Sequence, residues 1–381
     1  MIQIYSNSLG KEELGAIEEV FNSKWLGKGP KTKEFINRFS TKIITSNYEG
    51  MAFTRATPSN FITTTCCTEG IFQIMDLLNI KKNDEIILPS ISFVGVANAI
   101  MYKKAKPIFC DVDKHTLNPT AKHIREKITP KTKAVIIIHY AGVPCDIENI
   151  ASLCKEKNIK LIEDNANSPF SQYNNVNTGT FGDFGVWSFD AMKILVTGDG
   201  GLIYSKNKKY IEKLERLTYL GLESSSGLSN TIDKKWWQFE VSSPGRRSIT
   251  NDITSAIGIE QLKKVDYFIE KRKEIHEKYN SSFRHLDWIK LPSIPSNILS
   301  SYYMYHVQVN NRDEFAKYLR EKNIYTTFRY YPLHWVDFYK SNAKLPNTEY
   351  AANHTLNLPL HQNLTNDEIN YIIKTIKEWK Y

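Results

Sequence analysis

The decisive stretch of this sequence reads Gly185-Val186-Trp187-Ser188-Phe189-Asp190-Ala191-Met192-Lys193-Ile194-Leu195-Val196-Thr197-Gly198-Asp199-Gly200-Gly201. An apolar strand is predicted to lead into a lysine on a turn, and a glycine-rich bend then leads into a second strand. Most lysines lie on solvated surfaces, but Lys193 is held between strands and glycine turns by the backbone. Lysine forms Schiff bases with aldehyde cofactors. We therefore interpret Lys193 as a candidate catalytic residue.

An aldehyde cofactor of this kind also needs a carboxylate for its protonated pyridine nitrogen and donors for its phosphate. The carboxylate candidate is Asp164, at the end of an apolar strand, where ligands bind in open α/β sheets. It precedes the lysine by 29 residues (193 − 164), enough for a loop and one returning strand. The phosphate candidates are Ser188 and Thr68. Thr68 opens a predicted helix, whose free N-terminal amides favour an anion.

Buried apolar runs alternate with helical stretches between residues 63 and 206. Strands are predicted at Glu85–Leu88, Pro107–Val112, Ala134–His139, Lys160–Glu163, Val186–Phe189 and Gly201–Tyr204. A helix is predicted over Ile147–Lys157, with Asp146 placed to cap it. This alternation favours an α/β fold with a mostly parallel sheet and helices on both faces.

The two ends of the chain carry the remaining predicted elements. An amphipathic helix near the N-terminus places Leu14, Ile17, Val20 and Phe21 at helical spacing, and residues 49–62 read as an irregular insertion of no assigned role. A long aperiodic segment, 216–250, contains Trp236 and Trp237 and is expected to be functional. Beyond it we predict a helix from Asp252 to about Tyr279, strands over Ser301–Val309 and Ile324–Tyr330, and helices over Asp313–Lys322 and Asp367–Trp379. The predicted division is a large domain over 1–255 and a linking helix with a small C-terminal α+β domain over 256–381.

Composition excludes several classes of protein. No apolar run approaches the length of a membrane span, and the N-terminus lacks the pattern of a signal peptide. The five cysteines show no metal-ligand spacing, so we expect reduced thiols in a cytoplasmic protein and no metal site. The net charge of +9 has two possible explanations: a composition rich in surface lysines, or an electrostatic attraction for a phosphorylated substrate. Nucleic-acid binding is disfavoured because the basic residues are dispersed and no binding motif accompanies them.

Five segments in order resemble one family. The segment from Ser188 to Gly201, with its Ser-Phe-x-x-x-Lys and Gly-Asp-Gly-Gly, resembles the lysine segment of the DegT/DnrJ/StrS sugar aminotransferases, which are pyridoxal-phosphate enzymes of fold type I. Trp25–Pro30, Asp84–Val94, Ile162–Asn167 and Tyr331–His334 are similar to other motifs of that family, so the resemblance covers almost the whole chain. It implies a large domain with a mostly parallel sheet sandwiched by helices, plus a smaller C-terminal α+β domain.

The resemblance also assigns residues to the cofactor, pyridoxal 5′-phosphate. It implies that Lys193 forms the Schiff base and moves the proton, and dehydratase relatives have histidine there, so the lysine favours amino transfer. Cofactor contacts are expected from Asp164 at the pyridine nitrogen, Asn167 in place of a family glutamine, Phe93 on the ring face, and Ser188, Thr68 and the amides of Cys67 and Glu69 at the phosphate. Substrate contacts are expected from Arg329, His334 and Trp25.

Two departures from the family pattern concern phosphate binding. Cys66-Cys67-Thr68-Glu69 stands where the family has Ser-Gly-Thr-Ala, and a cysteine restricts the backbone more than glycine does. Arg247 stands where the family has an asparagine that binds the cofactor phosphate across the dimer. A guanidinium binds phosphate more strongly than an amide, so we hypothesise that Arg247 reaches the partner subunit's cofactor or substrate phosphate.

The function that the resemblance implies is transfer of an amino group from L-glutamate to a nucleotide-linked keto sugar, for surface glycans or secondary metabolites. It also implies a homodimer with the active site at the subunit interface. The two departures leave open a small phosphorylated ketone as the acceptor. A non-catalytic pyridoxal-phosphate-binding relative is a further alternative, disfavoured because the lysine, the carboxylate and the phosphate hydroxyls are all present.

Overall fold

The computed structural model describes residues 1–44, 57–223 and 239–380. Most of the predicted insertion and the middle of the aperiodic segment, including Trp236 and Trp237, lie outside these residues. Among the described residues, no helix is both long and apolar enough to cross a membrane.

The described residues form a central seven-stranded sheet in the order β1-β9-β8-β5-β4-β2-β3. Strands β3, β2, β4, β5 and β8 are parallel to their neighbours in this order. Among the described strands of this sheet only β9 runs in the opposite direction, antiparallel to both β8 and β1. The predicted mostly parallel sheet is therefore confirmed. The strands are β1 (Phe61–Thr64), β2 (Glu85–Pro89), β3 (Lys106–Cys110), β4 (Thr132–Ile138), β5 (Lys160–Asp164), β8 (Phe184–Ser188) and β9 (Gly201–Ser205).

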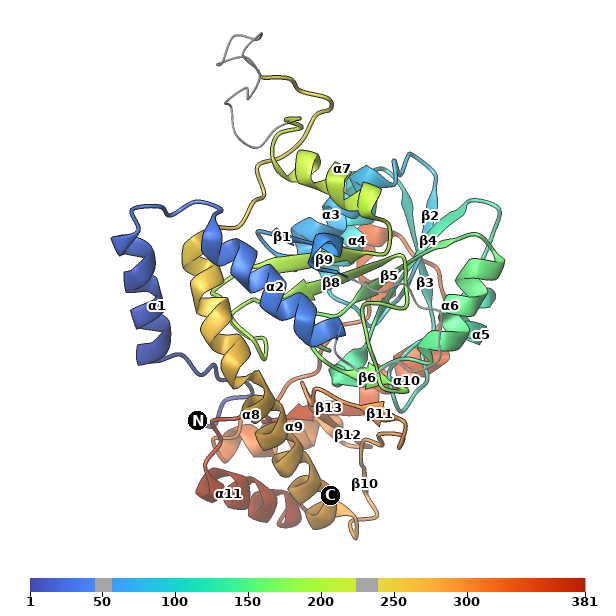
Figure 1. The fold of residues 1–381 in the computed structure, drawn as a ribbon. Helices are drawn as coiled ribbons and strands as arrows, with labels where there is room; N and C mark the ends of the chain where they lie inside the picture. Colours follow the sequence, from blue (N-terminus) through green and yellow to red (C-terminus); the bar gives the residue numbers. More distant parts are fainter. Residues whose placement is uncertain (45–56, 224–238, 381) are drawn as a thin grey trace.

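Helices cover both faces of the sheet (Figure 1). One face packs against α3 (Cys67–Leu77), α4 (Val94–Tyr102) and α7 (Lys208–Thr218), and the other against α2 (Pro30–Ile44), α6 (Ile147–Glu156) and α8 (Asp252–Phe283). Side chains of a strand alternate between faces, so Val186 joins the first core and Trp187 the second. The other helical elements of this part are α1 (Lys11–Asn22), α5 (Ala121–Arg125), η1 (Pro58–Asn60) and η2 (Tyr140–Gly142).

The long helix α8 connects this layered part to a smaller C-terminal part (Figure 1). Its Val265 lies in a core of the large sheet, and its Tyr279 lies in the core of the small part. The small part contains the antiparallel sheet β10-β12-β13 with α9, α10 and α11, while β11 pairs with β6 of the β6-β7 hairpin. The division between residues 255 and 256 stays a prediction. The elements are β6 (Gln172–Tyr173), β7 (Val176–Asn177), β10 (Ile289–Lys290), β11 (Ile298–Leu299), β12 (Tyr305–Val309), β13 (Thr355–Leu358), α9 (Arg312–Glu321), α10 (Pro346–His354), α11 (Asn366–Lys377), η3 (Leu333–Trp335) and η4 (Asp337–Tyr339).

Two local predictions were wrong, and a third was right for the position of the residue but not for its hydrogen bond. Residues 324–330 form no continuous strand, because Ile324 pairs with Ile2 while Thr327 pairs with Asn357, two different partners. Residues 301–304 precede β12 as an irregular segment, since their amides bond to the carbonyls of Gly142 and Ala141 instead of a strand. Asp146 occupies the N-cap position of α6, but its carboxylate accepts from the Asn149 side chain and not from a helix amide.

Candidate active site

Lys193 lies in the connection between β8 and β9, at the carboxyl end of β8. Backbone bonds fix the connection: Lys193 N donates to Asp190 O at 2.9 Å, and Thr197 N donates to Phe189 O at 2.9 Å. The carboxylate of Asp190 also accepts the Met192 amide at 3.0 Å. The backbone therefore positions this lysine, as the glycine-rich sequence indicated.

The Lys193 amine faces aromatic and acidic groups. Its Nζ lies 5.1 Å from the ring centroid of Tyr303, and no ion pair to it is present among the described residues. Burial alone would lower the pKa of Lys193, but the neighbouring Tyr303, Tyr330 and Asp164 outweigh it and raise the pKa above its ordinary value. This direction favours the ammonium form of the free amine.

Asp164, the last residue of β5, is buried beside the thiol of Cys67. Its Oδ1 accepts the Ala166 amide at 2.9 Å and lies 3.9 Å from Cys67 Sγ. Burial raises the pKa of Asp164, and the Ala166 amide and Lys193 act in the opposite direction. Burial and the Asp164 charge raise the pKa of the Cys67 thiol, so that thiol stays protonated.

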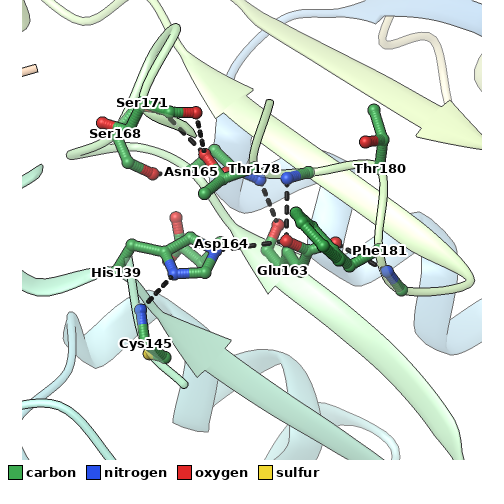
Figure 2. A network of polar contacts seen from close by, with 12 residues as sticks. His139, Cys145, Glu163, Asp164, Asn165, Ser168, Ser171, Thr178, Thr180 and Phe181 are labelled. Carbon is green, nitrogen blue, oxygen red and sulfur yellow. Dashed lines mark hydrogen bonds and ion pairs between the residues drawn. The ribbon is translucent and has the colours of Figure 1, made fainter. Parts of the chain in front are cut away.

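The neighbouring Glu163 points into a closed polar network (Figure 2). Its carboxylate accepts the amides of Gly179 at 2.8 Å and Gly182 at 2.6 Å, and contacts His139 Nε2 at 3.1 Å. The Cys145 amide donates to His139 Nδ1, so the ring proton lies on Nε2 and is donated to Glu163. This network ties the end of β4 and the loop before β8 to the strand that carries Asp164.

Asn167 and Phe93 both contact Tyr330, whose pKa is affected by Lys193 and Asp164. The Asn167 side chain is buried, and its Nδ2 has no hydrogen-bond partner among the described residues. Its Oδ1 accepts weakly from the Tyr330 hydroxyl at 3.5 Å. Phe93 is 47% exposed and packs edge-on against Tyr330, with 6.0 Å between ring centroids. An exposed ring face and an unpaired amide donor suit a flat ligand with an acceptor oxygen.

The N-terminus of α3 supplies the predicted phosphate donors. Thr68 lies in the first turn, close to the start of α4, because a Cβ on Gly95 would lie 2.9 Å from Thr68 Oγ1. Cys66 is the N-cap, and its Sγ accepts the Glu69 amide at 3.3 Å. Cys67 begins the helix and is not among the residues with positive φ, so this position does not require glycine.

Two predicted phosphate contacts face elsewhere in this chain. The Glu69 carboxylate accepts from Arg246 Nε at 2.7 Å, and the Glu69 amide donates to Cys66 Sγ. Arg247 is exposed, and its guanidinium lies over the ring of Tyr219 at 5.5 Å. That Arg247 reaches the site of a partner subunit remains a prediction.

Trp25, a predicted substrate contact, is exposed in the turn between α1 and α2, where its indole N–H donates to Lys28 O at 3.3 Å.

The two predicted substrate contacts of the C-terminal part differ in exposure. Arg329 is half-buried, and its guanidinium lies 3.4 Å from the sulfur of Met192, next to the lysine. His334 is buried, and its Nδ1 bonds to Ser90 Oγ at 2.7 Å. Burial also lowers the pKa of His334. Arg329 therefore contacts Met192, the residue before the lysine, whereas His334 links η3 to the end of β2.

Three tyrosines of this region carried no prediction. Tyr5, Tyr303 and Tyr330 come from separate parts of the chain and interact with one another around Lys193 and Arg329. The sequence contains 21 tyrosines, so the residue type alone singled none out. Tyr330 had a weak signal, because it directly precedes the Tyr331–His334 motif.

The arrangement fits pyridoxal 5′-phosphate. The unpartnered Asn167 Nδ2 supplies a donor for the ring oxygen, and Asp164 Oδ2 is left for the pyridine nitrogen because the bonds of this carboxylate within the protein go to Oδ1. Thr68 and Ser188 offer hydroxyls near a helix N-terminus. The described residues contain no cluster of three or more potential metal ligands.

Comparisons with known proteins agree with this geometry. The model of the DegT/DnrJ/EryC1/StrS aminotransferase family matches residues 7–377. A relative from Saccharopolyspora spinosa, dTDP-4-dehydro-2,3,6-trideoxy-D-glucose 4-aminotransferase, is 42% identical over 373 residues, covering 97% of this chain and 94% of the relative. The crystal structure of the aminotransferase TlmJ from Streptoalloteichus hindustanus is 44% identical with a TM-score of 0.91, covering 99% of this chain and 98% of that one. The PLP form of the putative sugar aminotransferase Spr1654 from Streptococcus pneumoniae, at 23% identity, TM-score 0.87 and coverage of 99% and 97%, shows the fold alone.

Proposed function

The chain belongs to the DegT/DnrJ/EryC1/StrS aminotransferase family and is a pyridoxal-phosphate-dependent aminotransferase, and on that premise we propose that it aminates the keto group of a nucleotide-linked sugar. The observation that carries the proposal is the grouping of Lys193, Asp164 and the unpaired Asn167 amide beyond β5 and β8. The relative from Saccharopolyspora spinosa is named for amination at carbon 4 of a dTDP-linked deoxysugar. We propose a 4-keto deoxysugar nucleotide as the acceptor and L-glutamate as the donor.

The residues of this chain divide the work around the cofactor. The bound cofactor supplies an aldehyde that condenses with amines and a ring that withdraws electrons. Asp164 would hold a proton at the pyridine nitrogen, and Asn167 would donate from Nδ2 to the ring oxygen. Ser188, Thr68 and the α3 amides would bind the phosphate. Phe93 would cover one ring face and exclude water there.

Lys193 has two tasks in the proposed reaction. It would anchor the cofactor through Nζ at rest, and its free amine, in the neutral form, would take up the proton of the donor's Cα. Arg329 contacts Met192, the residue before the lysine, and we propose that its guanidinium binds the donor's carboxylate. A positive group at this place suits glutamate better than a neutral donor.

We further propose that the chain works as a homodimer in the cytoplasm. Two large apolar side chains of α1 are exposed, Leu14 at 67% and Phe21 at 57%, while Ala16 and Val20 are buried. Apolar side chains left in water on one helix favour burial against a second copy. All five cysteines are unpaired, which suits a reducing compartment. Sedimentation of the purified protein tests the dimer directly.

The test is an absorbance spectrum of the protein with pyridoxal phosphate, before and after L-glutamate. We expect a yellow band that bleaches with glutamate and returns with 2-oxoglutarate or with a dTDP-linked 4-keto deoxysugar. Lys193→Arg, which keeps the charge, should show no lysine-bound band. A band that persists with every amino acid would contradict the transaminase proposal and would indicate a protein that binds the cofactor without catalysing amino transfer.

A second set of spectra separates the acceptors. A small phosphorylated ketone is added to the glutamate-bleached enzyme in place of the sugar nucleotide. Return of the yellow band with the ketone alone would contradict the sugar-nucleotide proposal while leaving the aminotransferase intact. Mass spectrometry of the product should show an amine in place of the keto oxygen.

A further inference from the structure

Four side chains form a column that ends at Lys193. Lys193 Nζ lies 5.1 Å from the Tyr303 ring centroid, and the Tyr303 and Tyr5 rings stack at 5.7 Å with an angle of 24°. The guanidinium carbon of Arg329 in turn lies over the Tyr5 ring, 4.6 Å from its centroid. The order is cation, ring, ring, cation, and the four residues come from distant positions in the sequence.

Tyr303 is the rigid member of this column. Its amide donates to Ala141 O at 3.0 Å, and its carbonyl accepts from Nη1 of the buried Arg272 at 3.3 Å. The side chain is fully buried, and its hydroxyl has no hydrogen-bond partner among the described residues. Tyr303 therefore faces the lysine with a ring whose position is fixed by its backbone, and the Tyr303 hydroxyl contributes no hydrogen bond among the described residues.

A ring face in this place favours the charged form of the amine. The face of an aromatic ring is electron-rich and attracts an ammonium within about 6 Å of its centroid. The described residues give Lys193 no carboxylate ion pair that would do the same. The other titratable groups around Nζ are Tyr330, Asp164 and Cys67.

We propose that Tyr303 is a positioning residue for Lys193: its ring face holds the free Nζ as an ammonium, while Tyr5 stacks with that ring and Arg329 lies over Tyr5. The proposal rests on Lys193 being the reactive lysine of the proposed function, and it adds the site where the amine rests when it is free. The column keeps the amine in one place instead of letting it sample many rotamers. It also sets the fraction of lysine that is neutral at a given pH.

The experiment measures acetylation of Lys193 in the cofactor-free protein with trace acetic anhydride, over a range of pH. Peptide mass spectrometry reports the extent of reaction at this lysine, and only the neutral amine reacts. Tyr303 is changed in three ways: Tyr303→Phe keeps the ring face, Tyr303→Leu removes it, and a tetrafluorinated phenylalanine keeps the shape but withdraws the electrons of the face.

We expect Tyr303→Phe to follow the unmodified protein. Tyr303→Leu and the fluorinated ring should both lower the pKa of Lys193, and so raise its labelling at neutral pH by about 2- to 30-fold, the range expected for a lost cation–π contact. Tyr302→Leu is the matched control, because this adjacent tyrosine packs against His276 and should leave the labelling unchanged.

Two results would overturn the proposal. Equal effects of Tyr303→Phe and Tyr303→Leu would assign the role to the hydroxyl, and no effect of the fluorinated ring would remove the ring face as the cause. The fluorinated variant conserves shape, so it decides the matter even if Tyr303→Leu unfolds. Failure of the proposed function is seen separately, as absence of the yellow band in the unmodified protein.

Discussion

Asn167 shows what a single buried atom reveals about a ligand. Its amide is buried, its backbone carbonyl accepts from Ser301 Oγ at 2.9 Å, and its Nδ2 is left without a partner among the described residues. A buried unsatisfied donor costs about 1–3 kcal/mol. A cofactor oxygen placed against it would remove that cost on binding. The shorter amide, in place of the family's glutamine, is thus held in position by its own backbone.

Replacing Asn167 should weaken cofactor binding more than it weakens the fold. Asn167→Ala removes a donor to a charged ring oxygen, a bond worth about 1.5–3 kcal/mol, which corresponds to about a 10- to 100-fold rise in the Kd of pyridoxal phosphate. Fluorescence titration of the cofactor-free protein measures it. Asn174→Ala, in an exposed turn, is the control. An unchanged Kd in Asn167→Ala would show that the amide does not meet the cofactor.

At the scale of the element, β5 ends with two acids that serve opposite faces. Successive side chains of a strand point to opposite sides, so Glu163 enters the polar network while Asp164 turns toward Lys193. Glu163 is fully buried, and three N–H groups bond to it. Glu163, which has no proposed chemical role, therefore fixes the strand end that carries Asp164, the acid proposed to bind the cofactor.

Glu163→Gln should loosen this strand end. The amide that it introduces turns an N–H toward donors that bonded to a carboxylate, so the free energy of unfolding should fall by about 1–3 kcal/mol. Urea unfolding followed by circular dichroism measures the loss. Glu148→Gln, whose carboxylate bonds to the Asn174 side chain near the surface, should stay within error of the unmodified protein. Equal stability of the two variants would argue against the network as a structural clamp.

At the scale of the whole molecule, three buried histidines make the C-terminal part sensitive to acid. Burial lowers the pKa of His276, His306 and His361 to about 4, from an ordinary value of 6.5. Between these values the unfolded chain binds protons that the folded chain excludes. Stability is therefore complete above pH 6.5 and is lost as the pH falls toward 4, the sign that linkage requires.

The pH dependence of unfolding tests this directly. As the pH falls from 6.5 to about 5, each of these buried histidines should lower the free energy of unfolding by about 1–2 kcal/mol. His306→Gln should flatten the curve of unfolding free energy against pH over this range, whereas His285→Gln, on the surface, should not. A curve of unchanged slope in His306→Gln would show that this histidine titrates alike in both states.

The sequence was informative where a pattern is local. The strand ending at Asp164 and the lysine turn were predictable because apolar runs and glycines act on their own neighbours. Strand β1 was missed because it has only four residues, two of them threonine. The failed strand over 324–330 takes two separate partners, Ile2 and Asn357, which no local pattern reveals. The tyrosines around the lysine meet only through tertiary packing.

The column at Lys193 has a consequence for building hybrid enzymes. Tyr5 and Lys193 precede the predicted boundary at residue 255, while Tyr303 and Arg329 follow it. In a hybrid of two parent sequences joined at this boundary, Lys193 and Tyr5 would come from one parent, and Tyr303 and Arg329, which contact them, would come from the other. Recombination at that point should preserve activity only for parents that agree at all four positions, and compatibility would depend on those residues more than on overall identity.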